Sequence, residues 1–138
     1  MCTPSTARPT STAQAQGWSM ASKFFLTFFT PEVPMSRIEI LKGFLKENAT
    51  DSFSRYALAL EYVKLGQNDD AVREFEKVQK NDPGYVATYY QLGQLYQKLG
   101  KRHEAEKTFR TGISVASKAS DDHTRSELEA ALETLLAS

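Results

Sequence analysis

The sequence matches itself when it is shifted by 34 residues. The second copy repeats the first through an apolar stretch, a glycine and a further apolar stretch. The paired residues are Tyr56 and Tyr90, Leu58 and Leu92, Tyr62 and Tyr96, Lys64 and Lys98, Leu65 and Leu99, Gly66 and Gly100, Ala71 and Ala105, and Phe75 and Phe109. A period of this length indicates a repeated helix-turn-helix, because neighbouring units must stack to bury an apolar face that neither can bury alone.

Helical signals extend on both sides of the repeat. Ser36 and Glu39 have the spacing of a capping box, in which the hydroxyl accepts from an early backbone N–H and the carboxylate reaches back to the cap. Glycine, proline and Ser-Asp breaks then divide the chain. Together they predict helices over about 36–47, 52–65, 68–80, 86–99, 102–118 and 121–136, and no strand.

Small residues are expected where the two helices of a unit meet. Ala59 and Gly93 on the first helices would face Ala71 and Ala105 on the second, so that the helices approach closely. Large apolar residues would fill the surrounding layer, each stabilising by roughly 1.5 to 3 kcal/mol if fully buried. Gly66 and Gly100 end the first helices, and we expect both glycines to have positive φ. These large residues are Leu58, Tyr62, Phe75 and their counterparts, joined at the N-terminal side by Ile38, Leu41, Phe44 and Leu45.

At these positions the chain resembles the tetratricopeptide repeat family. The matching residues of the first unit are Leu58, Ala59, Tyr62, Ala71, Phe75, Val78 and Pro83. Those of the second are Tyr89, Leu92, Gly93, Tyr96, Ala105, Phe109 and Gly112. The resemblance implies an all-α fold in which antiparallel helix-turn-helix hairpins stack as a short right-handed superhelix of about six helices.

Two positions depart from the family pattern. Arg55 stands where the first unit should carry a large apolar residue, and we expect Tyr56 or Phe53 to fill the resulting gap. Ser117 stands where the second unit should end in proline, which favours a longer helix over 102–118.

The repeat register predicts how the chain is organised. Residues 35–138 form the repeat domain. Its parts are a half-repeat helix at 35–51, the first repeat at 52–85, the second repeat at 86–119 and a capping helix at 120–138. In the capping helix, Leu128, Ala131, Leu132 and Leu135 share one stripe, and Glu127, Glu129 and Glu133 lie on other, solvated faces.

Residues 1–34 have a different composition, in which Ser, Thr, Ala, Gln and Pro dominate. We interpret them as a disordered tail or as a mis-assigned start upstream of Met35. A targeting segment is a weaker alternative, because the Phe24–Phe29 cluster is short for a signal peptide and no small-residue cleavage pattern follows it. The apolar segment from Trp18 to Phe29 could also fold back and occupy the binding groove of the domain.

Composition excludes several classes of function. The chain has 17 Lys and Arg against 17 Asp and Glu, so it lacks the basic surface that nucleic-acid binding requires. No apolar run approaches the roughly 18 to 20 residues needed to span a membrane. Cys2 is the single cysteine and cannot form a disulfide within the chain. A cytoplasmic protein that binds neither nucleic acid nor membrane is therefore expected.

Candidates for catalysis and metal binding are few. His103 lies at a variable family position in the first turn of a helix and is interpreted as a surface residue. His123 and Glu127, beside Asp121 and Asp122, could be drawn as a metal site, but zinc would need a further ligand, and acids in a first helical turn suit the helix dipole. No phosphate loop or nucleophile elbow is present. We therefore expect no catalytic site, no metal and no cofactor.

A binding groove is the remaining candidate site. In the implied stack the first helices line a concave face suited to a peptide or helix of a partner protein. Arg125 and Lys98 border this face, but the family's chaperone-binding carboxylate clamp is matched only at Arg125 and is not carried over. The alternatives are that the tyrosines merely pack between units, or that the protein associates with itself, for example as a homodimer. The predicted groove residues are Phe53, Tyr56, Leu60, Val63, Tyr90, Gln91, Gln94 and Gln97, with Ala87 beside them.

Overall fold

A computed structural model of the 138-residue chain describes residues 36–138. The chain divides into one unit at Met1–Ser36 and another at Arg37–Ser138. The expectations for residues 1–34 therefore fall outside the described residues. The described part is all helical, which confirms the expected class: α2 (Arg37–Glu47), α3 (Ser52–Lys64), α4 (Asn68–Asn81), α5 (Ala87–Lys98), α6 (Arg102–Lys118) and α7 (Asp122–Ala137).

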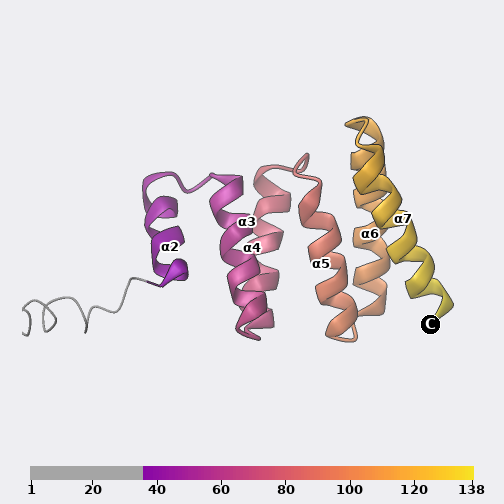
Figure 1. The fold of residues 1–138 in the computed structure, drawn as a ribbon, viewed down its shortest axis with the longest axis horizontal. Helices are drawn as coiled ribbons and strands as arrows, with labels where there is room; N and C mark the ends of the chain where they lie inside the picture. Colours follow the sequence, from indigo (N-terminus) through magenta and orange to yellow (C-terminus); the bar gives the residue numbers. More distant parts are fainter. Residues whose placement is uncertain (1–35) are drawn as a thin grey trace, which may run out of the picture. The chain divides into compact units, whose positions relative to one another are not determined.

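The helices of the second unit stack in chain order (Figure 1). Each packs on the next, and α5 also contacts α7 directly. The first helices of the hairpins, α3 and α5, thus share one layer with α7, while α4 and α6 form the layer behind them. None of these six helices is long and apolar enough to cross a membrane.

Both predicted glycine turns occur. Gly66 and Gly100 have φ of 75° and 77°, in the left-handed region that glycine adopts without cost. At the first turn the Gln67 N–H donates to the Tyr62 carbonyl and the Gly66 N–H donates to the Val63 carbonyl, the pattern of a Schellman motif. This motif satisfies backbone carbonyls at the end of α3 and turns the chain sharply into α4.

The close contact between α5 and α6 is made by glycines and aromatic rings. A Cβ atom at Gly93 would lie 2.3 Å from Cε1 of Phe109, and one at Gly112 would lie 2.5 Å from Cβ of Tyr89. Each helix therefore receives an aromatic side chain of the other where it carries a glycine. The ring of Phe109 supplies the atoms nearest to Gly93, and Ala105, expected to face Gly93, is fully buried.

The two helices of the first hairpin, α3 and α4, are joined by an ion pair. Arg55 occupies the position that Tyr89 has in the second repeat, and its Nη1 lies 2.7 Å from Oε2 of Glu74 on α4. Both side chains are only 13% exposed. Arg55 also donates to the Ala49 carbonyl before α3. The idea that Phe53 fills the gap is wrong, since Phe53 is 68% exposed.

The two ends of the stack differ in how well they are packed. In α2 only Leu41 is buried, and Phe44, expected in the core, is 53% exposed. The reason is that the described residues supply α2 with a neighbour on the α3 side only. At the other end, α6 spans 17 residues against 14 in α4, as the missing proline predicts. Leu128 and Leu135 anchor α7.

Candidate functional site

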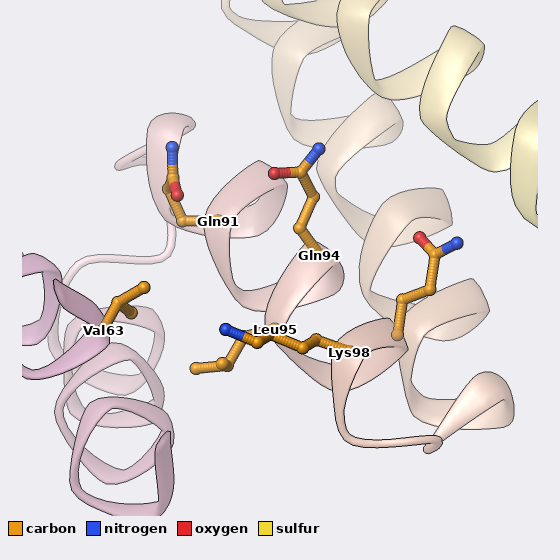
Figure 2. Close-up of a pocket in the computed structure, with 6 residues that line it drawn as sticks. Val63, Gln91, Gln94, Leu95 and Lys98 are labelled. Atoms are coloured by element: carbon orange, nitrogen blue, oxygen red, sulfur yellow. The ribbon is translucent and has the colours of Figure 1, made fainter. Parts of the chain in front are cut away.

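Two hollows lie on either side of α5. The α3–α5 hollow has a volume of about 420 Å³, and α3 contributes Val63 to it (Figure 2). Its α5 lining consists of Gln91, Gln94, Leu95, Gln97 and Lys98. The α5–α7 hollow, of about 310 Å³, is lined by Tyr90, Gln94, Gln97, Glu127, Ala130, Ala131 and Thr134.

The sequence of α5 explains why amides reach the surface between the hollows. Leu92 and Tyr96, four residues apart, are buried in the core. Gln94 and Gln97 fall on the opposite side of the helix and are exposed. These two glutamines line both hollows and so form a polar bridge across α5. The Gln94 amide nitrogen donates to the Tyr90 hydroxyl at 2.9 Å.

The predicted groove residues are only partly brought together. Val63 and Gln91 line the α3–α5 hollow, and Tyr90 lines the α5–α7 hollow. Phe53 and Leu60 line neither hollow: Phe53 lies exposed in the first turn of α3, and Leu60 packs partly buried against the core. The two hollows thus bring Val63 together with the four predicted residues of α5.

Tyr56 also lies outside the hollows and packs at the junction of the two repeats. Its ring centroid is 5.7 Å from that of Phe75 and 5.3 Å from that of Tyr85. Burial raises the pKa of Tyr56, and proximity to Tyr85 raises it further, whereas a hydrogen bond with Gln91 acts in the opposite direction. Burial also raises the pKa of Tyr85, as do the nearby Asp51 and Asp82 carboxylates. Both hydroxyls therefore stay protonated at neutral pH.

Part of the groove was missed from the sequence. Glu127 is exposed, as expected of a solvated face, and it also lines the α5–α7 hollow together with Ala130, Ala131 and Thr134. The spacing of these residues, three, four and seven positions from Glu127, is that of one helical face and was the available signal.

The charged groups around the groove are not equivalent. Arg125 pairs with Asp122 at 3.3 Å and Glu129 at 3.6 Å, so its charge is already balanced. Lys98 has no ion-pair partner among residues 36–138. Glu127 approaches His123 at 3.5 Å, a contact that is ionic only when the imidazole is protonated.

The residues considered for metal binding do not come together as one site. The Asp121 carboxylate accepts from the backbone N–H of Thr124 and from its hydroxyl, and these hydrogen bonds lower the pKa of Asp121. Asp121 is thus the N-cap of α7. Within residues 36–138, no three His, Cys, Asp or Glu side chains converge as a metal site would require. His103 lies on α6 beside Glu106 and Arg110, away from the groove.

A family model matches most of the repeat unit. The model for Regulator of microtubule dynamics protein 1-3 matches residues 39–137, which include almost all of α2 to α7. The chain belongs to the Regulator of microtubule dynamics protein 1-3 family. No curated protein matches this family member.

Solved structures identify the repeat type. A tetratricopeptide repeat domain protein from Salinibacter ruber is 39% identical to this chain, with a TM-score of 0.61. The match covers 63% of this chain and 97% of that one. The resemblance to tetratricopeptide repeats is therefore confirmed.

Two more distant structures show the same fold. The TPR2B domain of yeast Sti1, in complex with pHsp70, is 14% identical with a TM-score of 0.68, and the match covers 84% of this chain and 90% of that one. PcrH, in complex with the chaperone binding region of PopD, is also 14% identical with a TM-score of 0.68, covering 92% of this chain and 93% of that one. At this identity the two structures show only that this chain shares their fold.

Proposed function

We propose that the protein is a non-enzymatic interaction module that binds an extended segment of a partner protein across α5. The observation that carries this proposal is the pair of hollows joined by Gln94 and Gln97. Apolar side chains such as Val63 and Leu95 can receive an anchor residue, while the glutamine amides offer both donors and acceptors to a peptide backbone. A catalytic group, cofactor, nucleic acid or membrane has no part in this function.

The comparisons support the same class of function. The Sti1 structure of this fold is a complex with pHsp70, and the PcrH structure is a complex with the chaperone binding region of PopD. The family description adds a process, because it names the regulation of microtubule dynamics. We infer that the partner is a protein of the microtubule system and that the module works in the cytoplasm.

The proposal is tested by affinity capture with the full chain from native lysate, followed by mass spectrometry. The groove variant replaces Tyr90 and Gln94 with Ala, and a control variant replaces Lys107 and Thr111 with Ala at exposed positions of α6. We expect the groove variant to lose the partner and the control to keep it, with both melting near the parent temperature. Retention of every partner by the groove variant would show that the groove is not the binding site.

Self-association is a second candidate, favoured by apolar side chains exposed at both ends of the stack. Ile40 and Phe44 on α2 are 41% and 53% exposed, and Leu136 on α7 is 48% exposed. A homodimer formed through these ends would show a mass that rises with concentration in sedimentation equilibrium, and Phe44→Asp would abolish the rise. A single monomer mass over the whole concentration range rules this candidate out.

A further inference from the structure

The two hollows carry opposite charges. Lys98 lines the α3–α5 hollow, where its side chain extends from α5 toward the side of Val63 (Figure 2). Glu127 lines the α5–α7 hollow. Neither charge is balanced by a Lys, Arg, Asp or Glu side chain within residues 36–138, unlike that of Arg125. A ligand that crosses α5 therefore meets a cation on one side and an anion on the other.

The surface between these charges suits an extended backbone. Gln94 and Gln97 line both hollows, and a glutamine amide can donate and accept hydrogen bonds at once. An extended peptide presents free N–H and C=O groups to such amides. A helical ligand does not, because its backbone groups are bonded to one another.

We infer that the bound segment is an extended peptide with an acidic residue for Lys98 and a basic residue for Glu127, about three residues apart. The inference rests on the proposed function and specifies the chemistry of the partner. We take the spacing from the width of α5, which a ligand must cross to reach both charges: a helix with its side chains is about 10–12 Å across. Three residues of extended chain cover about 10 Å. A helical ligand would need about seven residues to cover the same distance.

The test uses a phage-displayed library of random decapeptides selected on the full chain. Peptides that also bind the Tyr90→Ala/Gln94→Ala variant are removed before sequencing. We expect the remaining peptides to be enriched in an acidic and a basic residue about three positions apart. In a synthetic peptide from this set, replacing the acidic residue by its amide should weaken binding by about two- to fivefold, the range for an exposed ion pair.

A charge reversal makes the test specific. In the Lys98→Glu variant the selected peptides should carry two basic residues in place of the acidic and basic pair, and in the Glu127→Lys variant they should carry two acidic residues. The control, Glu106→Lys/Lys107→Glu on α6, should select the original acidic and basic pair.

Three results would overturn the inference: enriched peptides without the charge pair, a charge pair unaffected by either reversal, or a spacing near seven, which assigns a helical ligand. A fourth result has a different meaning. If no peptide distinguishes the parent from the Tyr90→Ala/Gln94→Ala variant, the groove does not bind peptides, and the proposed function fails together with the charge pattern.

Discussion

At the scale of single residues, the fold depends on two glycines that receive aromatic rings. Gly93 accommodates Phe109, and Gly112 accommodates the base of Tyr89. The repeat pattern predicts a small residue at 93, but it does not predict which side chain fills the space. That choice depends on how far one helix is rotated against the other, and residue spacing along a single helix carries no such information.

We predict that Gly93→Ala destabilises the protein. The added methyl group would collide with the Phe109 ring, and overpacking of a filled core costs about 1–3 kcal/mol. Gly43→Ala is the matched control, because a Cβ atom at Gly43 meets nothing within 4 Å and alanine favours a helix by about 1 kcal/mol over glycine. Urea unfolding should show a lower midpoint for the first variant and a higher one for the second. Equal midpoints would mean that the ring moves aside at no cost.

At the scale of elements, the two hairpins are joined by different means. In the second hairpin Tyr89 packs against Gly112 of α6. In the first hairpin Arg55, at the position equivalent to Tyr89, forms an ion pair with Glu74 between α3 and α4. The departure from the repeat pattern was visible in the sequence. Its partner was not, because Glu74 lies among other charged residues of α4 and only the packing of the helices selects it.

The Arg55–Glu74 pair predicts an asymmetric response to mutation. Arg55→Leu should change the free energy of unfolding by about 1 kcal/mol or less, because an apolar residue replaces the buried cation and Glu74 keeps Lys77 at 2.9 Å. Glu74→Leu should cost roughly 3 kcal/mol, because it leaves the Arg55 guanidinium buried without a carboxylate. Chemical unfolding of both variants and of the double variant measures the difference. Equal costs for the two single changes would contradict this account.

At the scale of the whole unit, the sequence predicts the features that follow from the repeat pattern. It does not predict the features that depend on which helix lies next to a residue. Helix order, the glycine turns and the buried stripe of α7 follow from local patterns. The exposure of Phe44 and the place of Glu127 in the lining of the α5–α7 hollow do not. Both depend on which helix lies alongside, and at the two ends of a stack the repeat no longer specifies that neighbour.

Stability should therefore be uneven along the stack. One residue of α2 is buried, against six in α5, and in a repeat array each element is stabilised mainly by its immediate neighbours. We predict that backbone amides of α2 exchange with solvent first and those of α5 and α6 last. Hydrogen exchange followed by NMR measures the order. Protection of α2 equal to that of α5 would show that the unit opens only as a whole.

The glycine and aromatic contacts of α5 and α6 also limit how the sequence can change during evolution. A side chain larger than hydrogen at 93 requires the Phe109 ring to shift, and one at 112 requires Tyr89 to shift. In the first repeat the positions equivalent to 93 and 109 are held by Ala59 and Phe75. We expect a substitution that enlarges either glycine to be tolerated best together with a change at its aromatic neighbour. We therefore expect positions 93 and 109, and positions 112 and 89, to vary together among related sequences.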